Sequence, residues 1–506
     1  MKSLNSRDLF SKYCDPAEFP RIKEKDTVVE MWSDVIKEFK DDIAIEDNGN
    51  KYSYAQLDLD MSEFRGVFAD KNLKKGDHIG IFARNSYDLI KMYLAGITYG
   101  LVVAILPAHL DEKTLYGCSM MFNLKAICYA PDMEEKLSVC KAANPNLLLL
   151  SSELKGTATM MDTSLTKKDP AVIMFTGGTT GRPKGALLSQ GALMQGTVNG
   201  CYGIYHVFKQ RYILILPLSH VFGLIRNLMT SLYTGSDLFI CRNNKDMFRD
   251  IAVFKPTIIV LVPAVAEMAL NLTKQFHKNM LGDIKTVICG AAKVAPYLIS
   301  EYDKIGIQLL AGYGLTESSN LVSGNPESLK KPDSVGIPYP NQEFKVVNDE
   351  LWIKGLNMMD GYIGVPGANE EAYEDGWFKT GDLVKFDEDG YLYITGRCKE
   401  IIVLPTGENV SPAEVEIYFN ELKEVQDSQV FEDVDESGNH FLALEVVPRM
   451  TELMKVEAED KNKWLMEELQ KINMKLPPFE RVSRIVIRDT DFARTPAMKI
   501  VRYHKC

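Results

Sequence analysis

Apolar residues along the chain gather in short continuous runs that are separated by stretches of helical length. Residues 79–83 and 102–106 are two such runs, and residues 86–99 between them have a helical period, so they predict a strand–helix–strand unit with parallel strands. Further runs predict buried parallel strands of a large doubly wound α/β sheet, at residues 126–129, 171–175, 212–216, 258–262 and 286–289. Because ligands bind such sheets at the carboxyl ends of strands, we expect the segments after residues 175, 216, 289 and 310 to share one cleft.

Two capping-box patterns mark helix starts near the beginning of the chain. Thr27 and Glu30 precede apolar residues that share one helical face, and Ser53 and Gln56 repeat the signal before a second helix. We expect both helices to serve packing rather than chemistry.

The pattern changes after residue 335. Shorter alternating segments joined by Asn-Asp and Asp-Gly pairs predict antiparallel strands. Beyond residue 400 the sequence predicts a helix near 412–422, a hairpin through 435–439, an amphipathic helix at 461–474 and a strand at 484–488. We therefore expect an α/β fold in three parts: a large N-terminal domain (1–395) of doubly wound sheets with a small β-barrel-like subdomain, a hinge (396–400), and a small mobile α+β domain (401–506).

Length and composition narrow the class of protein. With 506 residues, the chain is long enough for two or more domains. Its formal net charge of −11 argues against a general nucleic-acid binder, since affinity for phosphates needs clustered Lys and Arg. Nine cysteines without a Cys-x-x-Cys pair are typical of reduced thiols in a cytoplasmic protein. No apolar run approaches the roughly 20 residues that span a bilayer, and the first residues lack the apolar core of a signal peptide.

The most informative stretch is MFTGGTTGRPKGALL, at residues 174–188. Here an apolar run opens into a loop rich in glycine and threonine that also contains two cations. The glycines allow backbone N–H groups to approach an anion closely, the threonines add hydroxyl donors, and Lys184 adds a positive charge. The loop is not a Walker loop, because a proline precedes the lysine and a glycine follows it. The alternative to a phosphate-binding loop is an ordinary surface turn.

This stretch resembles the phosphate-loop signature of the adenylate-forming (ANL) superfamily, which includes acyl-CoA synthetases, peptide-synthetase adenylation domains and luciferase-like enzymes. The TGGTTG form looks most like the AMP-dependent synthetases of medium- and long-chain acyl-CoA. The resemblance implies an AMP-forming acid–thiol ligase that uses ATP, Mg²⁺ and coenzyme A. It also implies that the β- and γ-phosphates are held by the loop residues Thr176, Gly177, Gly178, Thr179, Thr180 and Lys184.

A second motif, AGYGLTES at residues 311–318, follows an apolar run. Its turn offers an aromatic face, a hydroxyl and a carboxylate suited to Mg²⁺, and the alternative is a tight turn with an incidental acid. In the family this segment frames the nucleotide, so the resemblance implies Tyr313 against adenine, Thr316 on the α-phosphate and Glu317 on the metal. The resemblance adds further nucleotide-binding residues at Gly290, Ala291, Gly312 and Gly314.

Two motifs flank the predicted hinge. In WFKTGDL, at residues 377–383, Asp382 has two carboxylate oxygens that suit both ribose hydroxyls. The resemblance gives Asp382 that role, assisted by Arg397 of the following GRCKE. It also places Lys399 at the hinge and Gly407 where the loop backbone lines the pantetheine tunnel of the family. A solvated linker charge is the alternative for Lys399.

The last motif, FARTPAMKIVR, lies at residues 492–502. The resemblance gives Lys499 the position of the lysine that reaches the reacting carboxylate and the α-phosphate, whereas a basic tail is the alternative. The family usually has glycine before that lysine, and this chain has Met498. This departure bears on how the lysine reaches the site.

The segment LPLSHVFG, at residues 216–223, bears on which acid is activated. Peptide-synthetase domains commonly have Phe-Asp where this chain has Ser219 and His220, so an amino acid would lack a buried counter-charge here. We expect His220 and Phe222 to contact the acid, with a satisfied core histidine and core packing as the alternatives. A fatty or other hydrophobic acid is favoured.

Three functions remain open on this sequence. The first is transfer of the activated acyl group to coenzyme A, with the acid, ATP and coenzyme A as small-molecule partners. The second is loading of a phosphopantetheinyl carrier protein by the same chemistry. The third is a non-catalytic binder of nucleotide or acyl-adenylate.

Overall fold

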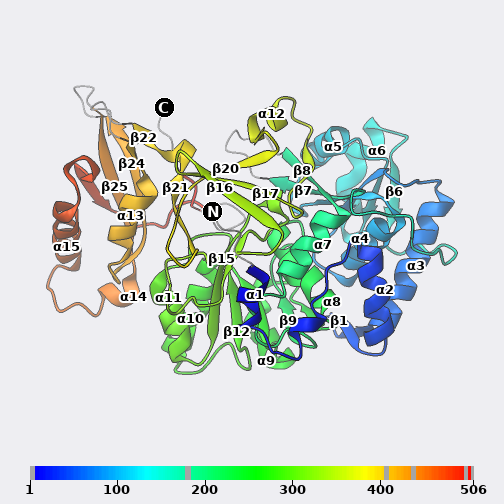
Figure 1. Cartoon of the computed structure of the whole chain (residues 1–506), viewed down its shortest axis with the longest axis horizontal. Helices are drawn as coiled ribbons and strands as arrows, with labels where there is room; N and C mark the ends of the chain where they lie inside the picture. The colour runs from blue at the N-terminus through cyan, green and yellow to red at the C-terminus, as the bar shows by residue number, and fades with distance from the viewer. Residues whose placement is uncertain (1–5, 177–183, 404–408, 435–439, 495–499, 503–506) are drawn as a thin grey trace. The chain divides into compact units, whose positions relative to one another are not determined.

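The computed structural model describes residues 6–176, 184–403, 409–434, 440–494 and 500–502. The chain forms two compact units, the first made of residues 1–343 with 354–378 and the second of residues 344–353 with 379–506 (Figure 1). The expected α/β class, with several sheets in a large N-terminal part and a sheet in a smaller C-terminal part, is confirmed. The expected domain limits and the hinge at 396–400 stay predictions.

The first sheet of the larger unit has seven strands in the order β18-β8-β7-β4-β3-β5-β6. Strands β3, β4, β5, β6 and β7 are parallel, whereas β8 runs antiparallel to β7 and β18 antiparallel to β8. The strands are β3 (His78–Phe82), β4 (Val102–Leu106), β5 (Ala126–Tyr129), β6 (Leu148–Ser151), β7 (Pro170–Thr176), β8 (Lys184–Ser189) and β18 (Gly361–Ile363).

The second sheet has nine strands in the order β15-β14-β13-β12-β11-β9-β10-β1-β2. Its parallel centre runs from β13 to β1, and antiparallel strands complete both edges. The strands are β1 (Ile43–Asp47), β2 (Asn50–Ser53), β9 (Arg211–Leu214), β10 (Asp237–Ile240), β11 (Ile258–Leu261), β12 (Thr286–Cys289), β13 (Gln308–Tyr313), β14 (Ser323–Asn325) and β15 (Ile337–Pro338).

The expected sheets are confirmed, and the strand positions were right to within one or two residues, although the runs that were grouped in one sheet divide between two. The strand–helix–strand unit has its helix at Tyr87–Tyr99, and both of its strands belong to the seven-stranded sheet. The runs near residues 212, 258 and 286 pair among themselves in the other sheet. A short apolar run predicts a buried strand but does not reveal which other strand it pairs with.

Helices of the larger unit cover these sheets, and one apolar core lies between the nine-stranded sheet and helices α9, α10 and α11. The α-helices are α1 (Ser6–Ser11), α2 (Val28–Phe39), α3 (Tyr54–Asp70), α4 (Tyr87–Tyr99), α5 (Glu112–Met121), α6 (Ser138–Ala143), α7 (Gln190–Asn199), α8 (Thr230–Tyr233), α9 (Met247–Phe254), α10 (Pro263–Phe276), α11 (Pro296–Lys304) and α12 (Ala368–Ala372). Short 3₁₀ helices are η1 (Phe19–Arg21), η2 (Pro131–Leu137), η4 (Asn244–Asp246) and η5 (Thr316–Ser318), and η3 (Phe222–Met229) is a π-helix.

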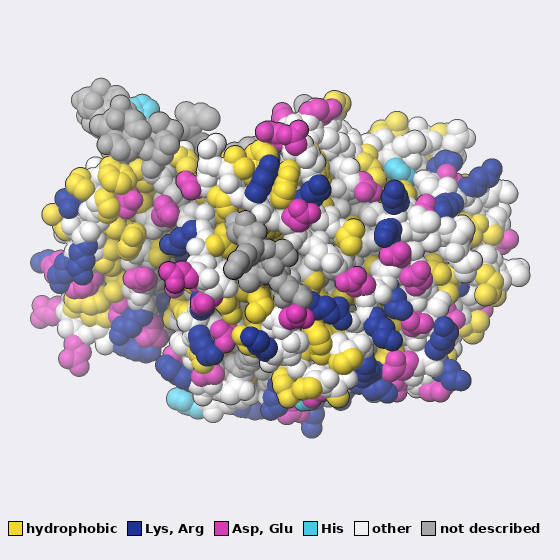
Figure 2. Space-filling model, viewed as in Figure 1, with side chains coloured by type: hydrophobic (Ala, Val, Ile, Leu, Met, Phe, Trp, Pro, Cys, Tyr) yellow, Lys and Arg dark blue, Asp and Glu magenta, His cyan; other side chains and the backbone are white. Residues whose placement is uncertain are grey.

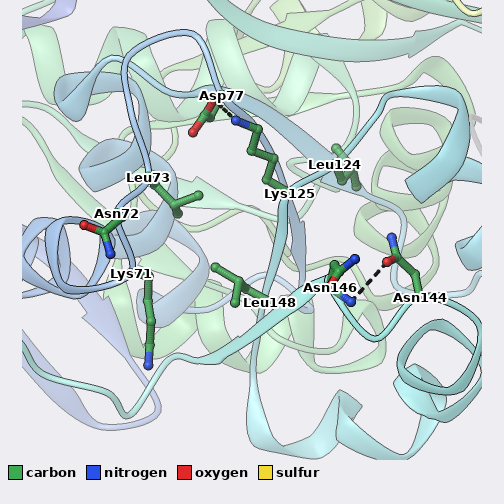
Figure 3. A pocket seen from close by; sticks show the side chains of 9 residues that line it. All are labelled: Lys71, Asn72, Leu73, Asp77, Leu124, Lys125, Asn144, Asn146 and Leu148. Carbon is green, nitrogen blue, oxygen red and sulfur yellow. Dashed lines mark hydrogen bonds and ion pairs between the residues drawn. The ribbon is translucent and has the colours of Figure 1, made fainter.

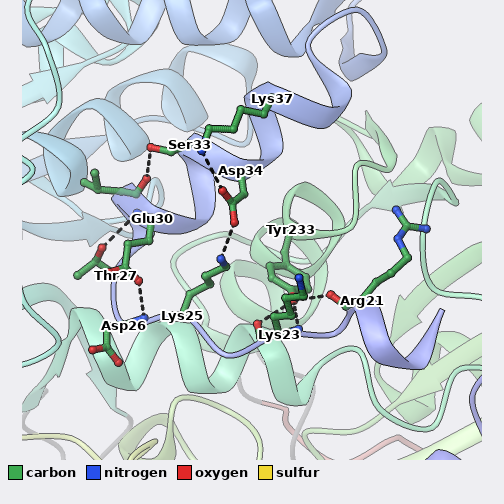
Figure 4. Close-up of polar contacts among 11 residues, drawn as sticks. Arg21, Lys23, Lys25, Asp26, Thr27, Glu30, Ser33, Asp34, Lys37 and Tyr233 are labelled. Carbon is green, nitrogen blue, oxygen red and sulfur yellow. Dashed lines mark hydrogen bonds and ion pairs between the residues drawn. The ribbon is translucent and has the colours of Figure 1, made fainter. Parts of the chain in front are cut away.

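Both predicted helix starts are confirmed. The Oγ1 of Thr27 accepts a hydrogen bond from the backbone N of Glu30, while the Glu30 carboxylate accepts one from Asp26 N rather than from Thr27 N (Figure 4). At α3, the Oγ of Ser53 accepts from Gln56 N at 3.1 Å. Each box is therefore half formed, because the second side chain binds elsewhere.

The smaller unit contains most of a five-stranded sheet, which stands where the barrel-like subdomain is expected, and a three-stranded sheet packed on helices. Its strands are β16 (Gln342–Val347), β17 (Glu350–Gly355), β20 (Trp377–Phe386), β21 (Leu392–Arg397), β22 (Ile402–Val403), β23 (Asn409–Val410), β24 (Val425–Val434), β25 (His440–Pro448) and β26 (Arg484–Ile487). The fifth strand of the first of these sheets, β19 (Tyr373–Glu374), belongs to the larger unit and pairs with the first two residues of β20. Helices are η6 (Cys398–Glu400), α13 (Pro412–Asn420), α14 (Met450–Leu453), α15 (Lys461–Lys475) and η7 (Pro478–Glu480). The Asn-Asp pair at 348–349 turns with positive φ at both residues, as expected.

Charged side chains of both signs are interspersed over the face of the molecule shown in Figure 2. This face presents no continuous basic stripe, in keeping with the acidic net charge. Among the described helices, none combines the length and the apolar character needed to cross a bilayer.

Candidate functional site

The turn that holds Thr316 and Glu317 is fixed by its own backbone. Leu315 N donates to Ser318 Oγ at 3.1 Å, and Asn320 N donates to Leu315 O at 2.9 Å. A Cβ at Gly314 would lie 1.2 Å from the carbonyl oxygen of Asn320, so only glycine fits there. The turn presents Thr316 and Glu317 half-buried at the end of β13.

Glu317 is held by a tyrosine that also contacts Lys184. The hydroxyl of Tyr362 donates a hydrogen bond of 2.6 Å to Oε1 of Glu317. The Nζ of Lys184 lies 4.8 Å from the centroid of the same ring. Burial raises the pKa of Tyr362, and the Glu317 carboxylate raises it further, so the hydroxyl keeps its proton and acts as a donor.

Strand pairing explains why these side chains meet. Strand β18 pairs with β8 so that Tyr362 stands opposite Ala186, two residues along the same face from Lys184. Thr176 and Lys184 in turn stand opposite each other across the β7–β8 pair. The two ends of the predicted phosphate loop are therefore brought together.

The segment before Tyr362 ties the turn to the sheet. Met359 N donates to Glu317 O at 2.8 Å, and Asp360 N donates to Leu187 O at 2.8 Å. The amide of Asn357 donates to Ser318 O at 3.0 Å. Residues 357–362 are thus a strap that joins the Glu317 turn to β8, and sequence reasoning missed it.

A second group of predicted residues meets at the ends of β12 and β13. A Cβ at Gly290 would lie 3.3 Å from the ring of Phe222 and 3.6 Å from Gly312 O, which shows how close these three residues are. Ala291 has φ of +66°, a left-handed conformation that is uncommon for a residue with a Cβ. The structure therefore brings Phe222, Gly290, Ala291 and Gly312 together beside Tyr313, the last residue of β13.

The carboxyl edges of the two large sheets are joined by Asn85, which follows β3. Its side chain donates to Leu216 O at 2.8 Å and accepts from Leu218 N at 3.0 Å. The turn η5 also packs against β7 and β8. The strand ends of the two sheets thus converge, as the expectation of a shared cleft required. His220, two residues beyond Leu218, is exposed.

In the smaller unit, Asp382 and Arg397 stand opposite each other on β20 and β21. Oδ1 of Asp382, which is 2% exposed, lies 2.8 Å from Nε of Arg397. The hydroxyl of Thr380 accepts from Asp382 N at 3.1 Å and donates to Leu351 O at 2.7 Å. This rigid pair of opposite charges provides acceptors and donors suited to a polyhydroxylated ring such as ribose.

Several predicted site residues lie outside the described residues: Gly177, Gly178, Thr179, Thr180, Gly407 and Lys499. The backbone of Lys399 belongs to η6. The roles assigned to all the site residues stay predictions.

Glu317 is the one predicted metal ligand, and its surroundings decide whether Mg²⁺ fits there. Among the described residues, no group of three or more His, Cys, Asp or Glu side chains is placed to enclose a metal ion. Mg²⁺ is commonly held by one or two carboxylates together with phosphate oxygens and water. Glu317, anchored on one oxygen by the Tyr362 hydroxyl, fits a metal that arrives with a phosphate chain.

One pocket of about 380 Å³ lies elsewhere in the larger unit (Figure 3). It is found at the amino ends of β3, β5 and β6, where Lys125 pairs with Asp77 at 2.6 Å. In a parallel sheet these ends lie opposite the carboxyl edge that carries Thr176. The pocket is therefore separate from the predicted site.

Comparison with known proteins agrees with this arrangement. The model of the AMP-binding enzyme family matches residues 32–363. Oxalate–CoA ligase of Arabidopsis thaliana is 28% identical over 84% of this chain and 89% of its own length. Indoleacetate–CoA ligase of Aromatoleum aromaticum is 32% identical over 58% of this chain and 61% of its own length.

Solved structures share the fold over nearly the whole chain. The o-succinylbenzoate CoA synthetase of Bacillus subtilis, solved with its acyl-adenylate intermediate, superposes with a TM-score of 0.77 at 21% identity and covers 94% of this chain and 97% of that one. The ATP-bound MatB of Rhodopseudomonas palustris gives a TM-score of 0.79 at 23% identity, with coverage of 93% and 97%.

The chain belongs to the AMP-binding enzyme family, whose model spans most of the larger unit. Within it, the chain is an AMP-forming acid–CoA ligase of the adenylate-forming superfamily, with ATP and coenzyme A as co-substrates. Relatives act on acids as different as oxalate and indoleacetate, so membership leaves the acid open.

Proposed function

We propose that the enzyme activates a carboxylic acid with a hydrophobic body as its acyl-adenylate and then transfers the acyl group to coenzyme A. A carboxylate is a poor electrophile, and attack of its oxygen on the α-phosphorus of ATP releases pyrophosphate and gives a reactive mixed anhydride. The thiol then attacks the acyl carbon, and AMP leaves. The observation that carries this proposal is that Tyr362 binds Glu317 through its hydroxyl and contacts Lys184 through its ring.

Each chemical task has a proposed residue. Thr176 and Lys184 hold the β- and γ-phosphates with the intervening loop, and Thr316 donates to the α-phosphate. Bound Mg²⁺ supplies positive charge that neutralises the phosphates, and Glu317 positions it. Asp382 accepts from the ribose hydroxyls, and Arg397 holds the Asp382 carboxylate in place at 2.8 Å.

The acid is proposed to lie against the segment that begins η3. Phe222 lies close to Gly290 and offers an apolar surface, and Leu224, two residues further along, is buried. His220 is proposed to contact the carboxylate end of the acid. The apolar surface favours an acid with a hydrophobic body, because moving that body out of water onto the surface lowers the free energy.

Lys499 is proposed to stabilise the charge that develops in the first half-reaction only, and movement about the hinge at Lys399 then exposes the site to the thiol near Gly407. Lys499→Ala is expected to reduce acid-dependent pyrophosphate exchange by about 10²-fold or more, the loss typical of removing one transition-state donor. Thioester formation from a supplied acyl-adenylate should change little. Equal loss of both half-reactions would refute this assignment.

The acceptor and the acid are tested together. Enzyme, ATP and a panel of carboxylic acids are mixed with either coenzyme A or a phosphopantetheinylated carrier protein, and the acylated thiol is identified by mass. Acylation of coenzyme A supports the proposal. Acylation of the carrier alone would make the chain a carrier-loading ligase, and binding of nucleotide without turnover for any acid would overturn the proposed activity.

We also propose a cytoplasmic location. Each described cysteine is a free thiol, and all of these except Cys398 are buried. Free thiols in this number are typical of a reducing compartment. Fractionation of cells that express the untagged chain tests this directly.

A further inference from the structure

A positively charged side chain, Arg226, is buried in the larger unit without an acidic partner. The residue is 3% exposed. Nη1 of Arg226 has no hydrogen-bond partner among the described residues. The guanidinium also forms no ion pair with any of these residues. Arginine is almost never fully buried unless it is paired, because removing its charge from water is unfavourable. The site therefore calls for an anion or a strong acceptor that the described residues do not supply.

The surroundings of Arg226 are polar but uncharged. Burial raises the pKa of Tyr212, and the nearby Arg226 opposes that rise; Arg226 acts in the same way on Cys201 and Tyr339. The charge of Arg226 thus acts on all three side chains, and the guanidinium lies near enough to the Tyr212 hydroxyl to lower its pKa by hydrogen bonding as well. The fully buried Tyr212 hydroxyl has no other hydrogen-bond partner among the described residues.

More unpartnered donors lie in the same neighbourhood. A Cβ at Gly196 of α7 would lie 2.5 Å from Ser319 O and 3.1 Å from the side chain of Ile225, the residue before Arg226. Three buried groups of this region have no partner within the described residues: Asn199 Nδ2, Ser319 Oγ and Asn320 Nδ2. One unpartnered acceptor, Oδ1 of Asn227, is next to Arg226 in the sequence. Two more unpartnered acceptors, Oε1 of Gln342 and Oδ1 of Asn357, belong to side chains bonded to Leu321 O, beside Ser319 and Asn320. None of these acceptors carries the negative charge that a buried guanidinium requires.

The neighbourhood adjoins the predicted acid site. Phe222, which lies close to Gly290, is four residues before Arg226 on the π-helix η3, so the two residues lie about one turn apart. Ser319 and Asn320 follow the turn that carries Glu317. The buried cation and Phe222, the proposed contact of the acid, therefore lie on one helix.

We propose that Arg226 recognises a second carboxylate at the far end of the acid, so that the substrate is a dicarboxylic acid with an apolar body. The proposal rests on the proposed function, because it assigns the remote end of the acid that this site activates. The paired guanidinium and carboxylate would satisfy the buried charge, and Tyr212 would add a hydroxyl donor. A free small anion such as chloride would pair with the Arg226 guanidinium in the same way, so it is the competing ligand for this site.

The test compares acids that differ only at the remote end. Pyrophosphate exchange is measured with straight-chain monocarboxylic and dicarboxylic acids matched in carbon number, over a range of lengths. We expect at least one dicarboxylic acid to exceed its partner in kcat/KM by about 100-fold or more, because a buried polar site strongly rejects an analogue that leaves it unpaired. Preference for the monocarboxylic acid at every length would overturn the proposal.

Variants assign the preference to the side chain. Arg226→Met should remove or reverse the preference, and Arg226→Lys should keep its sign while reducing its size. The control is Arg65→Met, because Arg65 is equally buried at 3% exposure but is bonded to Thr159 O and Thr98 Oγ1. That control should lower Tm and leave the ratio between the matched acids unchanged. A ratio that Arg226→Met leaves unchanged would refute the role.

Thermal unfolding separates this inference from the proposed function. Without substrate, Arg226→Met should raise Tm, because the substitution removes an uncompensated buried charge. A lowered Tm would mean that Arg226 is paired within the fold, and it would overturn the inference. Dicarboxylic acid without ATP should raise Tm of the unaltered protein and not that of Arg226→Met. That comparison remains valid if no acid supports pyrophosphate exchange. Stabilisation by chloride and not by any dicarboxylic acid would identify a free-anion site and refute substrate recognition.

Discussion

Replacing Tyr362 by Phe removes one hydroxyl and keeps the aromatic ring beside Lys184. The lost contact is the 2.6 Å hydrogen bond to Oε1 of Glu317. A hydrogen bond to a charged group contributes about 1.5–3 kcal/mol, and each 1.4 kcal/mol is a factor of ten in binding. If Glu317 positions Mg²⁺, we expect the variant to need about 10- to 100-fold more Mg²⁺, which is also the usual effect of removing a side chain that orients a metal ligand.

The assay follows the Mg²⁺ dependence of acid-dependent pyrophosphate exchange, together with the rise in Tm that MgATP causes. Tyr373→Phe is the matched control, because its hydroxyl donates to the backbone oxygen of Met359 at 2.9 Å and not to the Glu317 carboxylate. Tyr362→Phe should shift the Mg²⁺ midpoint in both measurements, and Tyr373→Phe should shift neither. An unchanged midpoint for Tyr362→Phe, with normal folding, would refute the metal-positioning role of this hydroxyl.

Two further predictions concern stability. Arg502→Met leaves Glu416, which is 6% exposed and bonded to Arg502 at 2.7 Å by both oxygens, as an uncompensated buried charge. We expect the free energy of unfolding, measured with urea, to fall by about 3–5 kcal/mol. The double variant that also carries Glu416→Gln should recover most of this loss. A double variant as unstable as the single one would contradict this reasoning. Burial, with the nearby Glu46, raises the pKa of Asp237 from its ordinary 3.8 to about 7. The folded state therefore keeps a proton that the unfolded chain releases, so stability should fall by up to about 1.4 kcal/mol per pH unit between about pH 4 and pH 7. Asp237→Asn should flatten that slope in urea titrations at a series of pH values, and an unchanged slope would exclude this group.

Local signals in the sequence predicted much of the fold. The strands at 102–106, 126–129 and 286–289 match the structure to the residue, because continuous apolar runs with β-branched residues specify buried strands. The division into two sheets was not predictable, since pairing depends on contacts between distant segments. The π-helix η3 was also missed, because its apolar sequence has no feature that separates it from an α-helix.

The site shows the same division. Motif order identified Glu317, Asp382 and the strand ends around the phosphate loop, but the partners of these residues come from elsewhere in the chain. Tyr362 is 45 residues from Glu317, and no local pattern links them. Arg226 did leave a signal, a charge within an otherwise apolar helical segment, whose meaning depended on finding it buried without a partner.

The central claim, that an oxygen of the carboxylate attacks the α-phosphorus of ATP, is tested most directly with an isotope. An accepted acid labelled with ¹⁸O in both carboxylate oxygens is incubated with the enzyme, ATP and coenzyme A, and the nucleotide and phosphate products are analysed by mass. One ¹⁸O in the phosphoryl group of AMP, with unlabelled pyrophosphate, is the result that the account predicts. Label in inorganic phosphate, with ADP as the nucleotide product, would contradict it.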